Sequence, residues 1–419
     1  MPLITDPPRS RIFYGWWIVL AAFLNLFFAV GIVFYGLPVF YPALVESLHF
    51  SRQQATTGVF LGFAAVAPVC GLLVGALIDR LGARVAILIG TGFVGVSLIL
   101  MGGVHSLRQY YLLCFTEVVG YVLAGPIPNQ VLVANWFRAL RGRAMGYAYL
   151  GLGVGGTVSP LLIHWLIVHF GWRRAFEVIG IAIVAALLPV GIWVTRSSPQ
   201  DMGLAPDGGL AQPVAAASAA AATTSRTTRE ALKTANFWLL LVGSTLVIAA
   251  IGTVISHFVL FLKDEGYSSG RASQALSVLL FSSLAGRVIV GYFADWFTRK
   301  NVMAVFYLTL ALAIPLLLVH HQARTVIAFA ILFGFAMGAD YMLIPLVAAD
   351  CFGLAALGKI LALIIMADSL GQTFGPVMAG HIFDTRHSYD LAWIIITAAG
   401  LTGAAAVYLI RSGRSGQRG

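Results

Sequence analysis

The sequence predicts an all-α membrane protein of twelve transmembrane helices, arranged as two halves of six. Its composition, the spacing of its apolar segments and an internal repeat support this fold class. Of the 419 residues, 59% are hydrophobic and only 10% are charged. A soluble protein carries about 25% charged residues, so this chain cannot cover a water-exposed surface. Lipid is the solvent that such a composition indicates.

Twelve apolar segments follow one another along the chain, each long enough to cross a bilayer as a helix, which takes about 20 residues. The predicted spans are residues 15–45, 55–78, 84–104, 108–134, 143–168, 174–195, 236–262, 272–294, 300–319, 325–349, 358–383 and 391–410. An even number of spans places both termini on the same side of the membrane.

The formal net charge of +10 does not indicate nucleic-acid binding, because the basic residues lie in short clusters between apolar segments. When the termini are placed in the cytoplasm, most Lys and Arg residues fall in cytoplasmic loops, as the positive-inside rule requires. We therefore expect a multi-pass protein of the cell's inner (plasma) membrane with both termini cytoplasmic. Arg287 is the one basic residue that lies in the interior of a predicted span, away from its ends.

Residues 196–235 form the only long polar stretch, and proline, glycine and an alanine run dominate it. This composition is typical of a linker. The predicted organisation is an N-terminal six-helix half (1–195), a cytoplasmic linker (196–235) and a C-terminal six-helix half (236–419).

The two halves repeat one another at an offset of 216 residues. The matched positions are Gly75 with Gly291, Asp79 with Asp295, Gly142 with Gly358, Gly155 with Gly371, Thr157 with Thr373 and Pro160 with Pro376. Such parallel repeats are related by an axis along the membrane normal, and substrate binds between them near mid-membrane.

Residues 75–84 (Gly-Ala-Leu-Ile-Asp-Arg-Leu-Gly-Ala-Arg) resemble the loop 2–3 signature of the major facilitator superfamily, and residues 291–300 resemble its copy in loop 8–9. The resemblance implies the major facilitator fold and a cytoplasmic latch between the halves, made by Asp and Arg pairs. The gating residues it implies are Gly75, Asp79, Arg80, Arg84, Gly291, Asp295 and Arg299. The alternative is a turn stabilised by charges at helix ends.

Residues 11–17, 135–146 and 170–176 are similar to helix-entry motifs of the monocarboxylate transporter group and its bacterial oxalate/formate-exchanger relatives. In these families an Arg of helix 8 binds the substrate carboxylate, and Arg287 matches that position. Its guanidinium stays charged and offers a planar fork to a carboxylate. The alternative is a permanent ion pair with Asp340 or Asp368.

Ionisable residues inside a membrane are costly and indicate function by default. Besides Arg287, the ionisable residues near the middle of the predicted spans are Glu117, Asp340 and Asp368. The two Asp residues outnumber Arg287 within one half, and burial and like charge both favour a protonated carboxyl. We therefore expect Asp368 or Asp340 to carry a coupling proton, with Glu117 as a further candidate. The alternative is a structural, hydrogen-bonded acid.

Weaker predictions concern uncharged side chains in the spans. Tyr121, which shares a helix face with Glu117, and Tyr341 offer hydroxyls to a bound anion. Asn129 and His257 are further candidates for substrate binding. Roles as hydrogen-bond partners between helices, or as a satisfied packing histidine, are the alternatives.

The resemblance has departures that bear on the substrate. The helix 1 Lys of animal monocarboxylate carriers is missing from residues 34–38, and Ser283 stands where they have an Asp. Oxalate exchangers carry a Lys near the position of Asp368. One Arg suits one carboxylate, so we expect a small monocarboxylate such as lactate or pyruvate.

The predicted function is proton-coupled symport of a monocarboxylate by alternating access. The runner-up is a proton-coupled exporter or antiporter of a drug, vitamin or other metabolite. A membrane sensor without transport ranks third. The sequence has no phosphate-binding Gly-Lys-Ser/Thr loop and no metal motif, so we expect no enzyme activity, cofactor or metal. The expected partners are the small organic anion, the proton and the bilayer, and a monomer is expected to suffice.

Overall fold

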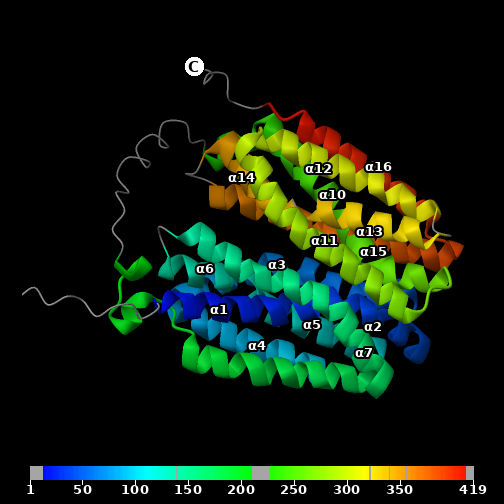
Figure 1. Cartoon of the computed structure of the whole chain (residues 1–419), viewed down its shortest axis with the longest axis horizontal. Helices are drawn as coiled ribbons and strands as arrows, with labels where there is room; N and C mark the ends of the chain where they lie inside the picture. The colour runs from blue at the N-terminus through cyan, green and yellow to red at the C-terminus, as the bar shows by residue number, and fades with distance from the viewer. Residues whose placement is uncertain are drawn as a thin grey trace, which may run out of the picture.

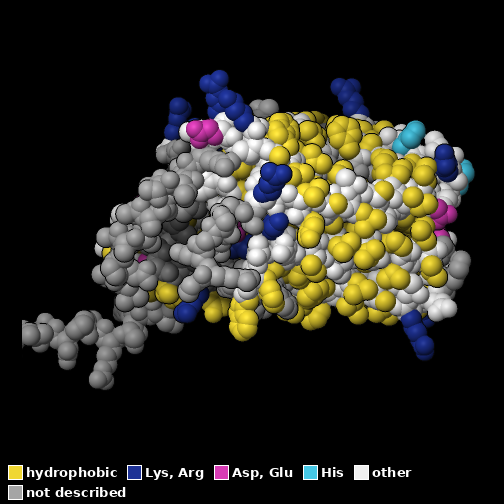
Figure 2. All heavy atoms as spheres, turned by 90° about the horizontal axis from the view of Figure 1, so that it is seen from above, with side chains coloured by type: hydrophobic (Ala, Val, Ile, Leu, Met, Phe, Trp, Pro, Cys, Tyr) yellow, Lys and Arg dark blue, Asp and Glu magenta, His cyan; other side chains and the backbone are white. Residues whose placement is uncertain are grey.

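The computed structural model describes residues 13–137, 140–209, 227–319, 322–338, 340–353 and 357–411, and within these ranges it is helical with no strands. The helices run side by side along the long axis of the molecule (Figure 1). Those of the N-terminal half form one group and those of the C-terminal half the other. Figure 2 shows a face with a broad hydrophobic area, and the Lys and Arg side chains lie mostly outside this area or at its border.

The N-terminal half begins with a single long helical crossing that contains a π-helical segment. The elements of this half are α1 (Gly15–Asn25), the π-helix η1 (Leu26–Ile32), α2 (Val33–Leu48), α3 (Arg52–Leu81), α4 (Ala83–Met101), α5 (Leu107–Ala124), α6 (Pro126–Trp136) and α7 (Arg141–Pro189).

Helix α7 supplies two crossings, because Gly171 interrupts it with φ 77° and ψ 158°. Only glycine adopts this backbone conformation without strain. The two arms match the predicted spans 143–168 and 174–195, and the π-helix η2 (Val190–Val194) follows the second arm.

The C-terminal half repeats the plan. Its elements are α10 (Ala235–Asp264), α11 (Ser269–Trp296), α12 (Arg299–Ala313), the 3-10 helix η6 (Ile314–Val319), α13 (Ala323–Met337), α14 (Asp340–Phe352), α15 (Leu357–Arg386) and α16 (Asp390–Tyr408). The predicted single span 325–349 is divided between α13 and α14.

Nine helical stretches within the described ranges are long and apolar enough to cross a membrane. One of them, Arg143–Val194, has 52 residues and contains the turn at Gly171, so it crosses twice. Helices α3 and α11, with 30 and 28 residues, provide two more crossings. The twelve-helix fold predicted from the sequence is confirmed.

The internal repeat has a packing role in both halves. A Cβ atom added to Gly155 of α7 would lie 2.4 Å from the carbonyl oxygen of Phe27, in η1. The matching Gly371 of α15 lies equally close to α10, where an added Cβ would be 2.5 Å from the carbonyl oxygen of Thr245. In each half, therefore, a glycine lets the fifth crossing touch the first, as small residues do in membrane helix pairs.

The linker is described at its two ends only. Residues 196–209 contain two 3-10 turns, η3 (Pro199–Met202) and η4 (Pro206–Gly209), and α9 (Thr228–Leu232) precedes α10. Trp136 donates from Nε1 to the carbonyl of Arg196 at 2.9 Å, which ties the first of these segments to α6. Residues 210–226 lie outside the described residues.

Candidate functional site

Asp368 lies in the middle of α15 and is bound by two hydroxyl groups of α10. Ser244 and Thr245 both donate to its Oδ1, at 2.7 Å and 3.1 Å. The residue is 8% exposed. Two donors on one oxygen give an ionised carboxyl the hydrogen bonds that it needs away from water.

Asp340, the first residue of α14, has a different environment. Its Oδ1 accepts a hydrogen bond of 2.5 Å from the Tyr307 hydroxyl of α12. Its Oδ2 is buried and has no hydrogen-bond partner among the described residues. Asp340 acts electrostatically on Asp368, so the structure brings the two predicted proton carriers into one neighbourhood.

Arg287 lies on α11 and is half-buried. Next to Arg287, α11 packs closely against α13. A Cβ atom added to Gly286 of α11 would lie 2.1 Å from the carbonyl oxygen of Phe335, and one added to Gly338, just after α13, would lie 2.2 Å from the carbonyl oxygen of Ser283. Three ion pairs occur in the described part of the chain, and Arg287 belongs to none of them. The predicted alternative, a permanent pair with Asp340 or Asp368, is therefore absent from this structure.

The N-terminal half faces Arg287 with phenolic side chains. Tyr149 of α7 interacts electrostatically with Arg287, and Gln130 of α6 donates from Nε2 to the Tyr149 hydroxyl. Tyr121 of α5 in turn lies near Tyr149 and near Tyr35 of α2. The residues that meet at this point therefore come from both halves.

Tyr149 and Gln130 were missed by the sequence analysis. Both lie within predicted spans, but uncharged polar residues are common in membrane helices and carry little signal by themselves. Tyr121 was expected, and its ring packs against Phe34 and Phe63 with centroid distances of 6.1 Å and 5.0 Å.

Glu117, one turn before Tyr121 on α5, is 2% exposed, and its Oε2 has no hydrogen-bond partner among the described residues. It interacts electrostatically with both Tyr121 and Tyr41. Glu117 is thus embedded in the N-terminal half, away from the two Asp residues of the other half.

Asn129 stabilises a helix break. Its Nδ2 donates to the carbonyls of Ala124 and Gly125, both at 2.7 Å, where α5 ends and α6 begins. Pro126 and Pro128 lack the N–H groups that would continue the helix. The amide group therefore caps carbonyls that the break exposes, and its buried Oδ1 has no partner among the described residues.

His257 of α10 is fully buried, and both ring nitrogens contact the protein. Nε2 lies 2.9 Å from the carbonyl of Pro376, and Nδ1 lies 3.0 Å from the Tyr389 hydroxyl. A carbonyl only accepts, so Nε2 carries the proton and Nδ1 accepts from Tyr389. Burial raises the pKa of Tyr389, which keeps this hydroxyl protonated. In this conformation His257 offers no free nitrogen to a substrate.

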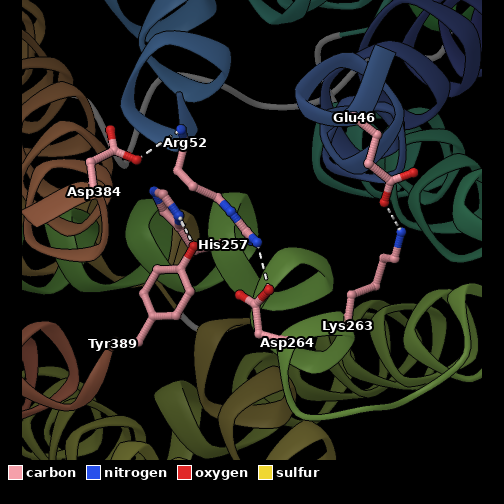
Figure 3. Close-up of polar contacts among 7 residues, drawn as sticks. All are labelled: Glu46, Arg52, His257, Lys263, Asp264, Asp384 and Tyr389. Atoms are coloured by element: carbon pink, nitrogen blue, oxygen red, sulfur yellow. Dashed lines mark hydrogen bonds and ion pairs between the residues drawn. The ribbon is translucent and has the colours of Figure 1, made fainter. Parts of the chain in front are cut away.

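One end of the molecule holds a group of charged contacts between the halves, which we call the outer seam (Figure 3). Arg52 of α3 pairs with Asp264 of α10 at 2.5 Å. The Asp384 carboxylate of α15 accepts from the backbone N–H groups of Arg52 and Gln53, at 3.0 Å and 3.1 Å. The predicted topology places this end outside the cell.

Two further features belong to the outer seam. Lys263 of α10 forms an ion pair with Glu46 of α2. Helix α3 also has a cap of its own, because Ser51 accepts from the Gln54 N–H and the Gln54 side chain accepts from the Ser51 N–H. The start of α3 is therefore capped by Ser51 and Gln54 of its own half and by the Asp384 carboxylate of the other half.

Two arginines of the loop signatures, at the opposite end of the molecule, contact described residues of their own half. Arg84 donates to the carbonyls of Gly191 and Ile192, at 3.0 Å and 2.5 Å, and Arg299 pairs with Asp350 at 2.8 Å. All of these partners lie in the same half as the arginine. Among the described residues, ion pairs join the two halves at the outer seam, and the latch between Asp and Arg residues of the loop signatures stays a prediction.

Arg80 is exposed at the end of α3. The side chains of Asp79, Asp295 and Tyr341, and the surroundings of Gly75 and Gly291, lie outside the described residues. Within the described ranges, no group of three His, Cys, Asp or Glu residues is placed to hold a metal ion. The polar groups that meet at Arg287 are a guanidinium, phenols and an amide, while the carboxyls of Asp340 and Asp368 have their partners within the C-terminal half. These groups suit an organic anion and protons.

Comparisons with known proteins agree with this fold. A model of the Major Facilitator Superfamily matches residues 18–311 and 266–418. Monocarboxylate transporter 13 of Rattus norvegicus is 25% identical over 407 residues, which cover 96% of this chain and 89% of the relative. The protein named "Probable L-galactonate transporter" of Escherichia coli is 25% identical, covering 93% and 89%. Among solved structures, nucleoside transporter NupG (D323A mutant) aligns with a TM-score of 0.74 at 14% identity, covering 94% of this chain and 99% of its own.

Proposed function

The chain belongs to the major facilitator superfamily, and from this premise we propose that it moves a small organic monocarboxylate together with a proton. The N-terminal half (1–195) and the C-terminal half (236–419) would rock about the site between them, joined by the linker. We place the protein in the cell's inner (plasma) membrane, with both termini cytoplasmic and one chain sufficient for transport.

The observation that carries the proposal is the position of Arg287 outside every ion pair that the described residues make. A guanidinium in a low-dielectric environment is costly without an anion. A bound carboxylate would supply that anion through two parallel hydrogen bonds. Tyr149, which interacts with Arg287 from the opposite half, would then contact the same anion.

The charges also support coupling to a proton. A carboxylate on Arg287 makes a neutral pair, whereas an ionised Asp368 in the same half would leave a mostly buried negative charge with no ion-pair partner among the described residues. Protonation of Asp368 removes that charge, so we expect anion and proton to be favoured together. We prefer Asp368 over Asp340 and Glu117 because it is the least buried of the three, with 8% of its surface exposed.

Two relatives support the substrate class by name. One is called a monocarboxylate transporter and the other is named for L-galactonate, which is itself a monocarboxylate. Lactate and pyruvate are small monocarboxylates that one guanidinium would bind in the same way.

The test is uptake of radiolabelled lactate and pyruvate by proteoliposomes under an inward proton gradient. Wild type is expected to show gradient-stimulated uptake, and Arg287→Ala to lose it by at least about tenfold, the effect of one charge-assisted hydrogen-bond pair. Arg324→Ala, which removes an exposed arginine, serves as the matched control and is expected to transport normally. An unstimulated wild type, or an active Arg287→Ala, would overturn the proposal.

A second candidate is an antiporter in which the acids bind a cationic solute. The unpartnered Oδ2 of Asp340 and Oε2 of Glu117 favour it, because free carboxyl oxygens are what a buried cation requires. The same vesicles distinguish the two functions. For the antiporter, a cationic solute is exchanged for protons, Asp340→Asn abolishes this exchange and Arg287→Ala leaves it intact.

A further inference from the structure

The Ser244 hydroxyl has two acceptors and one proton. Asp368 Oδ1, across the contact with α15, lies 2.7 Å from its Oγ. The carbonyl oxygen of Leu241, on its own helix α10, lies 3.2 Å away. A serine hydroxyl donates one hydrogen bond at a time. The two contacts are therefore alternatives, and Ser244 can turn from one to the other without moving a heavy atom.

We propose that Ser244 is a positioning residue that allows Asp368 to hold and release a proton inside the membrane, by turning its hydroxyl between Asp368 and Leu241. The inference deepens the proposed function, since it rests on Asp368 being the coupling acid.

The two protonation states use the same atoms. When Asp368 is ionised, Ser244 and Thr245 both donate to its Oδ1. When a proton from water arrives, the new O–H of Asp368 donates to the oxygen of Ser244, whose own proton turns to the carbonyl of Leu241. The added proton stays on Asp368 and no covalent bond of Ser244 changes. Each state has its hydrogen bonds satisfied, so neither carries the penalty of an unmet buried donor or acceptor.

Thr245 also donates a hydrogen bond to Asp368, but its hydroxyl has a different set of acceptors from that of Ser244. Its Oγ1 donates to Asp368 at 3.1 Å, and the structure gives no second acceptor for it. Its carbonyl oxygen is where Gly371 of α15 makes close contact, as an added Cβ would lie 2.5 Å away. The hydroxyls of Ser244 and Thr245 therefore lie where α10 and α15 are in close contact, and the contact at Gly371 is one helical turn from Asp368.

Other charges near Asp368 are few. Asp340 on α14 is the titratable side chain that acts electrostatically on it within the described part of the chain. His257 on α10 and His381 on α15 are each 13 residues along their helices from Ser244 and Asp368, which is about 20 Å. Asp264 and Asp384 lie farther still, at the outer seam. The substitution Asp340→Asn removes the charge of this second carboxyl. In that variant, the titration of Asp368 and the effect of Ser244 on it can be measured without Asp340.

The test is an infrared pH titration of the purified full-length protein in lipid, following the carbonyl band of protonated carboxyls. The Asp368 band is identified by its loss in Asp368→Asn. In Ser244→Ala both forms of Asp368 lose a hydrogen bond, but the bond to the ionised carboxylate is charge-assisted and about twice as strong, so the midpoint is expected to move to higher pH by about one unit. Ser244→Thr, which keeps the hydroxyl, is expected to restore the wild-type midpoint. Ser244→Cys, a weaker donor, is expected to give an intermediate shift if Ser244→Ala does not fold.

Ser256→Ala is the matched control. Ser256 is buried on the same helix and donates only to the carbonyl of Gly252, at 2.7 Å, so its loss should leave the midpoint unchanged. An unshifted Ser244→Ala, or an equal shift in Ser256→Ala, would overturn the inference. The titration needs no substrate. A Ser244-dependent midpoint in a protein without lactate or pyruvate uptake would therefore support the inference while refuting the proposed substrate.

Discussion

Arg52, at the start of α3, forms an ion pair with Asp264, at the end of α10, although the two residues belong to different halves of the chain. The guanidinium of Arg52 also lies over the ring of Phe383, 4.4 Å from its centroid. With Asp384 on its backbone N–H, Arg52 is thus held by side chains of α10 and α15. Opening of the molecule at the outer seam requires all of these contacts to separate.

We predict that Asp384→Asn shifts the protein towards a state open at the outer seam. The substitution removes the charge from the hydrogen bonds to Arg52 and Gln53, and charge-assisted hydrogen bonds contribute about 1.5–3 kcal/mol each. A shift of about tenfold in the population is expected. Spin labels on Ser47→Cys and Thr385→Cys, both exposed on opposite halves, report the separation as a longer distance.

The control for this measurement is Asp390→Asn, which removes an exposed carboxylate near the same end. It should leave the distance distribution as it is in wild type. A distribution in Asp384→Asn that matches wild type would show that the carboxylate does not hold the seam.

We predict that Gly31→Ala is destabilising while Gly92→Ala is tolerated. A Cβ on Gly31 would lie 2.6 Å from the backbone Cα of Gly155, whereas a Cβ on Gly92 meets nothing within 4 Å. Backbone cannot give way as a side chain does, so overpacking should cost about 1–3 kcal/mol. Thermal unfolding of both variants in the same detergent checks the difference. Equal stabilities would contradict the close contact of η1 with α7.

We predict that Tyr149→Phe raises KM for the carboxylate about fivefold with little change in maximal rate. The substitution keeps the ring and removes a hydroxyl worth about 1 kcal/mol to a bound anion. Tyr147→Phe, an exposed tyrosine of the same helix, is the control. Initial-rate uptake across a range of concentrations separates KM from rate, and an unchanged KM in Tyr149→Phe would remove Tyr149 from the site.

The sequence predicts the fold well because an apolar segment of crossing length has few alternatives in a membrane. It does not predict where the crossings break. The division of 325–349 into α13 and α14, and the cap that Asn129 places on the break at Gly125, depend on which carbonyls find partners in three dimensions. Composition contains no information about that choice.

The site is predicted unevenly for a related reason. A charge inside a span is conspicuous, and Arg287, Asp340 and Asp368 were all found that way. Tyr149 and Gln130 were not, because their importance comes from lying opposite Arg287, which depends on how the halves pack. Arg52 and Asp264 lie at helix ends, where charges ordinarily reflect topology, so their pairing across the halves had no signal in the sequence.

The cap that Ser51 and Gln54 place on α3 has a consequence for the reversibility of opening. When Asp384 moves away, the first turn of α3 loses the carboxylate that belongs to the other half. It keeps the cap made by Ser51 and Gln54, so we expect it not to fray. In the backbone of that first turn, water then has only the amide hydrogens of Arg52 and Gln53 to solvate. The contact between the start of α3 and Asp384 can therefore break and form again in each opening and closing, because the first turn of α3 stays helical throughout.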